Sequence, residues 1–232
     1  MTDTPIFQLE NVGVDYPLPS ARKGDVAGVV GLDGVDLTIP RSGLTVLAGP
    51  SGSGKSTLLR VLSLFQTPTR GRVVFEGTPV SSSPRRRRAL RRDSIGLVFQ
   101  TPTENLLPHL SVADNLHAAA QSARRRCDPA ALLDRLGLGG TEQWRIGALS
   151  GGQQQRLAFA CVLARGCPVV LADEPTSQLD DSSASHVLDA IALLQAEGVA
   201  VVASSHDERV LEQGSRVFRL RAGRVIEEEN EP

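Results

Sequence analysis

The feature that most constrains the fold is a glycine-rich loop between two apolar runs, Gly49-Pro50-Ser51-Gly52-Ser53-Gly54-Lys55-Ser56-Thr57. The run before it, 44–48, is typical of a buried strand, and the run after it, 58–62, is typical of a helix. A Gly-x-x-x-x-Gly-Lys-Ser/Thr loop in this setting is a phosphate-binding loop. Its backbone N–H groups and the helix dipole surround an anion, Lys55 adds a full charge, and Ser56 offers a hydroxyl to Mg²⁺. The loop therefore predicts a bound nucleoside triphosphate. A plain Gly/Ser turn would leave Lys55 unexplained, because Lys23 is the only other lysine.

The composition fits one large globular domain, or one domain with a subdomain, since the chain has 232 residues with 41% hydrophobic and 22% charged side chains. A net charge of −1 gives no global attraction to nucleic acid or anionic lipid. The three cysteines lack metal or redox spacing, no charged-then-apolar leader follows Met1, and the apolar runs are shorter than the roughly 20 residues that span a bilayer. We expect a reduced, cytosolic protein, so that any membrane crossing falls to another chain.

The pattern along the chain predicts two kinds of sheet. Residues 6–12 and 35–39 alternate apolar and polar positions, which is typical of half-exposed antiparallel strands, and a Pro- and Gly-rich stretch from Pro17 to Gly34 reads as their connection. Residues 73–77 continue this layer, whereas later apolar strands alternate with helices and predict a parallel sheet. The chain should end in a hairpin turning at Ala222-Gly223, followed by a frayed acidic tail over 227–232.

Two further stretches divide the chain. From about 101 to 149 there is helical periodicity without a clear strand, which predicts an inserted helical subdomain. Before it, the basic run 85–92 contains six arginines and is typical of a solvated helical face, with contact to anionic lipid or nucleic acid as the alternative. The predicted fold class is α/β, with a phosphate-loop core built on a mainly parallel sheet, an antiparallel β layer and an inserted α-helical subdomain.

Four apolar strands each end in residues that carry chemistry. These ends are the phosphate loop, Gln100, the pair Asp173-Glu174, and His206. In open parallel sheets ligands bind outside the carboxyl ends of the strands, so the four sets should meet at one rim.

Each rim residue suits one part of phosphoryl transfer to water. Asp173 would hold Mg²⁺, while Glu174, already charged at neutral pH, would orient the attacking water. Gln100 has the reach to touch both Mg²⁺ and water, and His206 would donate to the γ-phosphate and hold Glu174. The plainer alternatives are an Asp-Glu turn before Pro175 and an ordinary polar Gln at a strand end. A Ser205-His206-Asp207 relay is excluded, because consecutive residues cannot align their side chains for it.

A second glycine motif, Ser150-Gly151-Gly152-Gln153, opens another helix. Ser150 and Gln153 form a capping box, which explains those two residues but not the glycines. Each glycine forgoes roughly 1 kcal/mol of helix propensity relative to Ala while exposing backbone N–H groups to an anion. Because one phosphate site is already assigned, the second is explained most simply if it serves the nucleotide of another copy of the chain, with two chains sandwiching two ATP molecules head to tail.

With Leu149 this motif reads Leu-Ser-Gly-Gly-Gln, and nearly the whole chain resembles the ATPase subunit of an ATP-binding cassette (ABC) transporter. The resemblance implies that Tyr16 stacks on adenine and that the loop 177–180, ending at Asp180, touches the opposite subunit. Gln178 and Cys161 depart from the family pattern. The stretch 105–112 is similar to the lipoprotein-release, macrolide-export and cell-division branch, and its Leu-Leu-Pro loop either receives a permease helix or packs inside the subdomain.

The resemblance also implies the organisation and the partners. Residues 1–232 would form one ABC ATPase domain, with a nucleotide-binding core over 1–100 and 156–232 and a helical subdomain over 101–155. We expect ATP and Mg²⁺ as cofactors and a second copy of the chain as partner. An integral membrane permease would be reached through the helical subdomain, placing the chain peripherally on the cytoplasmic face of the membrane; no nucleic acid is expected.

Two other functions remain open from the residues alone. A soluble cassette ATPase acting on DNA or ribosomes would explain the arginine run, but the chain has neither a second cassette nor a long coiled-coil insertion. A small-molecule kinase would leave the motif at 149–153 without a task, and Glu174 suits water better than a bound acceptor.

Overall fold

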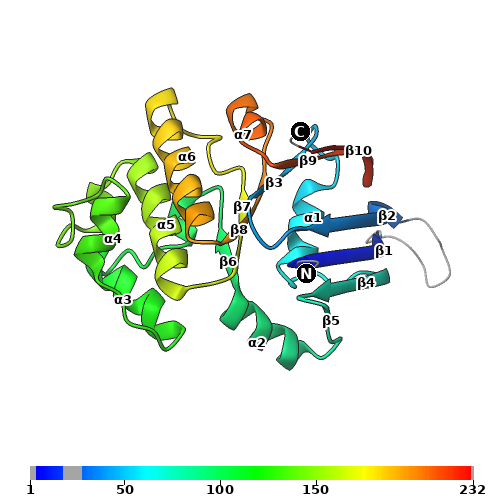
Figure 1. The fold of residues 1–232 in the computed structure, drawn as a ribbon, viewed down its shortest axis with the longest axis horizontal. Helices are drawn as coiled ribbons and strands as arrows, with labels where there is room; N and C mark the ends of the chain where they lie inside the picture. Colours follow the sequence, from blue (N-terminus) through cyan, green and yellow to red (C-terminus); the bar gives the residue numbers. More distant parts are fainter. Residues whose placement is uncertain (1–3, 18–27, 231–232) are drawn as a thin grey trace.

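The structure of the protein is a computed structural model that describes residues 4–17 and 28–230. Two sheets and a group of helices make up the fold, with the helices of residues 112–196 gathered at one end and the smaller sheet at the other (Figure 1). The elements in chain order are β1 (Phe7–Pro17), β2 (Gly28–Ile39), β3 (Leu44–Ala48), α1 (Lys55–Leu62), β4 (Arg70–Phe75), β5 (Thr78–Pro79), α2 (Pro84–Ser94), β6 (Ile95–Val98), η1 (Pro102–Glu104), α3 (Val112–Ser122), α4 (Pro129–Arg135), η2 (Ile146–Ala148), α5 (Gly151–Arg165), β7 (Val169–Asp173), α6 (Asp181–Ala196), β8 (Ala200–Ser204), α7 (Glu208–Glu212), β9 (Arg216–Arg221) and β10 (Arg224–Asn230).

The larger sheet has six strands in the order β10-β9-β3-β8-β7-β6. Every neighbouring pair from β9 to β6 is parallel, and only β10 pairs antiparallel. The strands that precede the phosphate loop, Gln100, Asp173 and His206 are therefore parallel neighbours. This confirms the predicted parallel sheet and brings the four carboxyl ends to one edge.

Two apolar cores lie on the two faces of this sheet, because successive side chains of a strand point to opposite sides. Val46 of β3 belongs to the core that α5 and α6 cover, whereas Leu47 belongs to the core shared by α1 and the smaller sheet. Strands β3 and β8 are buried at every position, as their unbroken apolar runs predict for strands covered on both faces.

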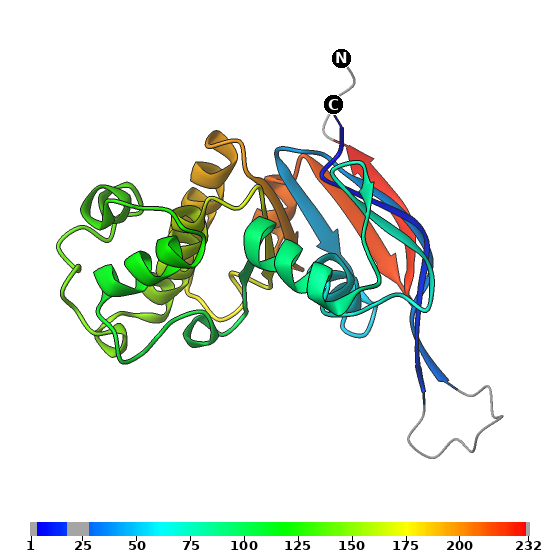
Figure 2. The same cartoon turned by 90° about the horizontal axis from the view of Figure 1, so that it is seen from below.

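The smaller sheet has the order β2-β1-β4-β5, with all pairs antiparallel. The rings of Phe7 and Phe75 meet edge to face between β1 and β4, with centroids 5.0 Å apart. The expected connection from Pro17 to Gly34 extended too far toward the C-terminus, because β2 already begins at Gly28. Residues 18–27 lie outside the described part. Figure 2 shows β1 and β2 as a long ribbon that extends beyond the rest of the sheet.

The stretch 101–149 holds only short helices, namely η1, α3, α4 and η2, and a single isolated bridge between Ser111 and Arg145. Ser111 caps α3 by accepting a hydrogen bond from the N–H of Asp114. Asp128 caps α4 in the same way, by accepting from the N–H of Ala131. No β-strand lies within 101–149, as the helical periodicity of this stretch predicts. Within 4–17 and 28–230, none of the helices combines the length and the apolar character that crossing a membrane requires.

The expected frayed tail was wrong for residues 227–230. Strand β10 runs to Asn230 and pairs with β9 back to Arg216. Opposite charges face each other across this ladder, with Glu228 Oε1 3.1 Å from Arg216 Nη1 and Glu227 Oε2 3.4 Å from Arg219 Nε. The glutamates that suggested a solvated tail are thus the acidic side of a cross-strand pairing.

Candidate functional site

The phosphate loop forms the floor of a cleft of about 640 Å³. Gly54 precedes α1 with φ of 110°, so the helix begins at Lys55 and its first N–H groups face the loop. Lys55 Nζ donates to the carbonyl oxygens of Gly49 at 2.6 Å and Pro50 at 3.2 Å. The ammonium group is thereby held over the loop, and the floor of the cleft carries both a full positive charge and the helix dipole.

Two of the loop glycines are required by backbone conformation and close packing. Gly49 has φ of 145°, and a Cβ there would collide with the carbonyl oxygen of Leu220. At Gly54 a Cβ would lie 2.9 Å from the carbonyl oxygen of Gly31. Both positions combine a left-handed φ with contact to another strand, so side chains are excluded from both.

The turn between β9 and β10 braces the loop from behind. The N–H of Gly223 donates to Ser53 O at 2.9 Å, and its carbonyl accepts from the N–H of Asp33 at 2.8 Å. Arg224 Nε donates to Asp33 Oδ2 at 2.8 Å, and this hydrogen bond, aided by the charges of Arg224 and Arg70, lowers the pKa of Asp33. The phosphate loop, β2 and the C-terminal hairpin are thus joined through one glycine.

Three of the four predicted rim residues line the same cleft as the loop, namely Gln100, Glu174 and His206. Glu174 lies between two of the others: its Oε1 is 3.9 Å from Lys55 Nζ, and its Oε2 is 3.0 Å from His206 Nδ1. The side chain of Glu174 is only 17% exposed, whereas His206 is 73% exposed. The carboxylate therefore points into the cleft, with the imidazole covering its solvent side.

Asp173 lies on the other side of the loop. It lines a neighbouring cavity of about 360 Å³ together with Ser56, and Ser56 lines both cavities. Asp173 thus shares this second cavity with Ser56, while Glu174 lines the cleft.

Ser204, which the sequence reasoning missed, holds this carboxylate pair. Its buried hydroxyl donates to Asp173 Oδ1 at 2.5 Å and accepts from the N–H of Glu174 at 3.0 Å. Glu174 has φ of 44°, a left-handed conformation unusual for a residue other than glycine. The signal in the sequence was a polar residue at the end of the apolar strand 200–204, two positions before His206.

Gln100 reaches the cleft through a short chain of hydrogen bonds. Its Nε2 donates to Ser177 Oγ at 3.1 Å, and Ser177 Oγ donates to the carbonyl of Glu174 at 3.0 Å. The structure thus adds Ser177 to the site as a link between β6 and the turn that carries Glu174.

Tyr16 forms the far wall of the cleft. Its hydroxyl donates to Thr57 Oγ1 at 3.3 Å, so the ring stands beside the first turn of α1. Val29 and Val30 on the paired strand line the same wall and are 58% and 52% exposed. An aromatic face flanked by exposed apolar side chains, one helix turn from a phosphate site, suits a nucleotide base.

Comparison with known proteins settles what this arrangement belongs to. The family profile described as ABC transporter matches residues 32–177. The chain belongs to the ABC transporter family. It is the ATP-binding, ATP-hydrolysing cassette of such a transporter.

Among its relatives, the macrolide export ATP-binding/permease protein MacB of Hyphomonas neptunium is 39% identical over 96% of this chain. The pyoverdine export ATP-binding/permease protein PvdT of Pseudomonas fluorescens is 37% identical over 96%. The chain spans about a third of the length of both relatives, 34% in each case. A dimeric, post-hydrolysis structure of the ATP-binding cassette MJ0796 bound to ADP and Pi is 31% identical, with a TM-score of 0.82 over 97% of this chain and 98% of that one.

The cassette's second glycine motif lies outside the cleft of its own chain. Ser150 and Gln153 form the predicted capping box at the start of α5, with hydrogen bonds of 2.9 and 3.3 Å. Gly151 is exposed, but Gly152 is buried, and a Cβ there would lie 2.7 Å from Ser183 Cβ. Gly152 therefore has a packing role as well, because its missing side chain lets α5 pack on α6.

Asp180 also lies outside the cassette's own cleft. It caps α6 by accepting from the N–H and the hydroxyl of Ser183, at 2.9 and 2.8 Å. These hydrogen bonds lower its pKa. Asp180 and the 150–153 motif thus share Ser183 as a neighbour, one through a cap and the other through Gly152.

The oxygen donors of the cassette fit Mg²⁺. Ser56 offers a hydroxyl, Asp173 a carboxylate and Gln100 an amide, all hard ligands. In the described part of the chain no group of three or more His, Cys, Asp or Glu side chains is placed to hold a metal. Such a sparse donor set suits a cation that keeps waters and takes its other ligands from phosphate oxygens.

Proposed function

We propose that this cassette hydrolyses MgATP as a head-to-tail dimer and drives a conformational change in a membrane permease. The observation that carries the proposal is the position of Glu174, directed into the nucleotide cleft between Lys55 and His206. A carboxylate there, beside the residue that receives the terminal phosphates, is placed to act on a water rather than on a protein or small-molecule acceptor.

The residues divide the reaction between them. The backbone N–H groups of 49–57 and Lys55 bind the phosphates, and Tyr16 stacks on the base. Glu174 accepts a hydrogen bond from the attacking water and orients it, and His206 fixes Glu174 and donates to the γ-phosphate. Ser56, Asp173 and Gln100 would hold Mg²⁺, which neutralises charge that develops on the phosphate oxygens. Gln100 reports the state of the cleft to the segment that follows it, through Ser177.

The second copy of the chain supplies the other wall of each site. Ser150 and Gly151 are exposed at the N-terminus of α5, where an anion is favoured, yet they do not line their own cleft. A head-to-tail dimer would place Ser150, Gly151, Gly152 and Gln153, with Asp180 nearby, against the nucleotide of the partner. The dimeric state of the related ADP-bound cassette supports this arrangement.

The permease would dock where the helical region meets the sheets. The cavity of about 360 Å³ beside Asp173 is lined by apolar and charged side chains, among them Leu59, Phe65, Phe99 and Glu104. Phe65 is 57% exposed there. The curated relatives are named as ATP-binding/permease proteins, which supports a membrane partner and a position on the cytoplasmic face. Residues 1–100 and 156–232 would move as the nucleotide-binding core and 101–155 as the helical subdomain.

The mechanism is tested by Glu174→Gln, with Glu197→Gln as the matched control, because Glu197 pairs with Arg135 on the surface. We expect Glu174→Gln to lower ATP hydrolysis by roughly 10²-fold or more while ATP still binds. The control should hydrolyse ATP normally. Unchanged hydrolysis by Glu174→Gln would refute the role given to Glu174.

The dimer is tested by size-exclusion chromatography of Glu174→Gln with and without ATP. We expect ATP to shift this variant from monomer to dimer, since the trapped nucleotide joins the two chains. Adding Ser150→Arg should keep the protein monomeric without weakening ATP binding to the single chain. If Ser150→Arg instead abolished ATP binding by the monomer, the motif at 150–153 would act in its own cleft and the head-to-tail proposal would fail.

A further inference from the structure

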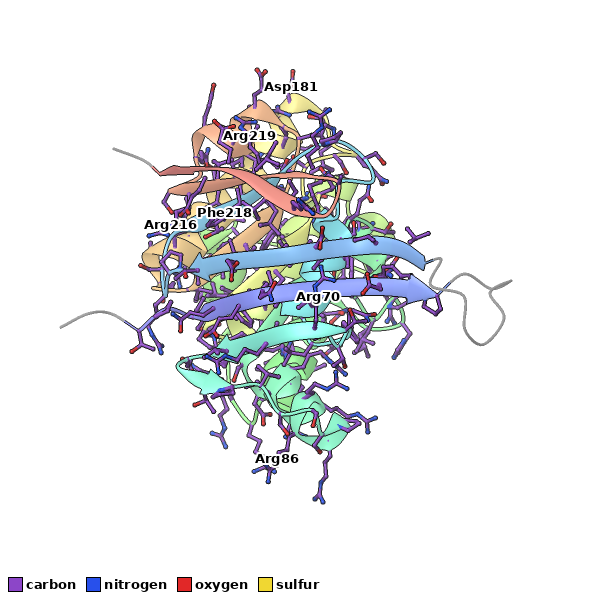
Figure 3. All side chains as sticks on the ribbon, turned by 90° about the vertical axis from the view of Figure 1, so that its right-hand side faces the viewer. Arg70, Arg86, Asp181, Arg216, Phe218 and Arg219 are labelled. Atoms are coloured by element: carbon purple, nitrogen blue, oxygen red, sulfur yellow. The ribbon has the colours of Figure 1, made fainter. Side chains whose placement is uncertain are left out.

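Helix α2 exposes a set of arginines without partners. None of its residues is buried, and Arg85, Arg86 and Arg88 have no ion-pair partner among the described residues. Figure 3 shows Arg86 projecting from α2 into solvent, away from both sheets. An ordinary solvated helix of this length is usually balanced by acidic side chains at neighbouring positions, whereas here Asp93 is the only carboxylate in the helix.

The structure places a second arginine run beside the end of α2. Arg165 Nη2 donates to the carbonyl of Arg92 at 2.6 Å, which joins α5 to α2. The pKa of Asp93 is lowered by its hydrogen bond with Arg92 and further by the charges of Arg124 and Arg165. Arg125 follows in the same turn and packs against Gly166, at the end of α5.

These residues form one surface, which we call the basic face: Arg85, Arg86, Arg88, Arg92, Arg124, Arg125 and Arg165. Within residues 4–17 and 28–230, only Arg92 among them forms an ion pair with a carboxylate, Asp93 at 2.7 Å. The whole chain has a net charge of −1, so this concentration of positive charge is local and is balanced elsewhere. A surface of this kind attracts anionic groups over about one Debye length.

The basic face borders the cavity assigned to the permease. The guanidinium of Arg91 lies 4.1 Å from the ring centroid of Phe65, and its Nη1 donates to Leu64 O at 3.3 Å. Phe65 also lines the cavity beside Asp173. Helix α2 is thereby fixed to the rim of that cavity, on the side that would face the permease.

We propose that the basic face binds the anionic lipid headgroups of the membrane that holds the permease. The proposal rests on the proposed function, because the permease sets which side of the cassette faces lipid. A convex helix carrying guanidinium groups suits a broad phosphate surface. The residues of the basic face are all arginines, and Arg91 already lies over the ring of the nearby Phe65, so this face lacks the successive aromatic side chains on which the bases of a nucleic acid strand stack.

The test is sedimentation of the purified chain with vesicles of phosphatidylcholine, with and without phosphatidylglycerol. The wild-type chain should bind the anionic vesicles and not the neutral ones. Replacing Arg85, Arg86 and Arg88 by Gln should weaken this binding about tenfold or more, and replacing them by Lys should preserve it. The double variant Arg124→Gln and Arg125→Gln, with the arginines of α2 intact, should also bind anionic vesicles more weakly than the wild type.

The matched control removes three arginines elsewhere, Arg72, Arg216 and Arg221, by substitution with Gln. Figure 3 shows the strands of the smaller sheet lying between Arg216 and Arg86. This control should bind anionic vesicles as the wild type does. If the control lost as much binding to anionic vesicles, the effect would come from the net charge of the chain, and the assignment to this face would be wrong.

Two other results would overturn the proposal. One is that the same amount of wild-type protein sediments with and without phosphatidylglycerol, which is expected if the arginines of α2 contact only water. The other is salt-sensitive binding to RNA or duplex DNA without binding to anionic vesicles. ATP hydrolysis in solution, measured without vesicles, should be unchanged in every arginine variant. Hydrolysis thereby reports on the proposed function separately from the lipid contact.

Discussion

The Oγ of Ser204 lies 2.5 Å from Asp173 Oδ1, and the same oxygen accepts the N–H of Glu174 at 3.0 Å. One buried hydroxyl at the end of β8 thus fixes both acidic residues at the end of β7. The register makes this possible, because Asp173 pairs with Ser204 in the parallel ladder. Ser204 therefore positions Asp173 and Glu174, the residues proposed to hold Mg²⁺ and to orient the attacking water, relative to one another.

Ser204→Ala should therefore affect the metal more than the nucleotide. A hydrogen bond to a charged group contributes about 1.5–3 kcal/mol, so we expect the Mg²⁺ concentration for half-maximal hydrolysis to rise roughly tenfold, with little change in ATP affinity. Ser204→Thr, which keeps the hydroxyl, should restore it.

Ser205→Ala is the matched control, since Ser205 is equally buried but its hydroxyl accepts from the N–H of Asp207. An identical Mg²⁺ dependence in Ser204→Ala and Ser205→Ala would contradict the positioning role.

Tyr16 separates stacking from hydrogen bonding. Tyr16→Ala should weaken ATP binding by about 1–3 kcal/mol, because it removes the ring that faces the base. Tyr16→Phe should bind nearly as tightly as the wild type, since it loses only the 3.3 Å contact with Thr57. Titration with a fluorescent ATP analogue measures both. If Tyr16→Ala bound the ATP analogue as tightly as the wild type, the proposed stacking of the base on Tyr16 would be wrong.

Gly223 and Arg224 should differ sharply in their effect on stability. Arg224→Ala removes an exposed ion pair to Asp33 and should cost less than about 1 kcal/mol. Gly223→Ala should cost about 1–3 kcal/mol, because φ is 78° and a Cβ would lie 3.1 Å from Gly31 O. Urea unfolding gives both free energies. Equal costs would mean that the turn does not brace the phosphate loop through its backbone.

Asp207 gives a dependence of stability on pH with a definite sign. Hydrogen bonds from Arg209 and Thr176 lower its pKa below the ordinary 3.8. A carboxyl with a depressed folded-state pKa stabilises the fold above its unfolded pKa, and this contribution is lost as the pH falls through the folded value. The difference in unfolding free energy between wild type and Asp207→Asn should hold constant near neutrality and change only below pH about 4. A difference that varied between about pH 6 and 8, well above the range in which this carboxyl titrates, would contradict the role given to Asp207.

The sequence was informative where chemistry and local structure coincide. The phosphate loop follows from residues 44–62 alone, because an apolar strand, glycines, Lys55 and a helix occur in a fixed order. The convergence of Gln100, Glu174 and His206 on that loop was also predictable, since parallel strands bring their carboxyl ends to one edge. Residues 227–230 were misjudged, because their acidity looks like a solvated tail until β9 supplies the arginines opposite them.

By itself, the sequence determined the phosphate loop and predicted that Gln100, Glu174 and His206 would meet it in a larger site. Only the tertiary structure decided how the two carboxylates are held, why Gly152 lacks a side chain, and that the arginines at 85–92 and 124–125 share one surface. The physical reason is the range of the interactions. A motif records contacts within a few residues, whereas Ser204 meets Asp173, and Arg165 meets Arg92, only after the parallel sheet and its covering helices have brought distant segments together.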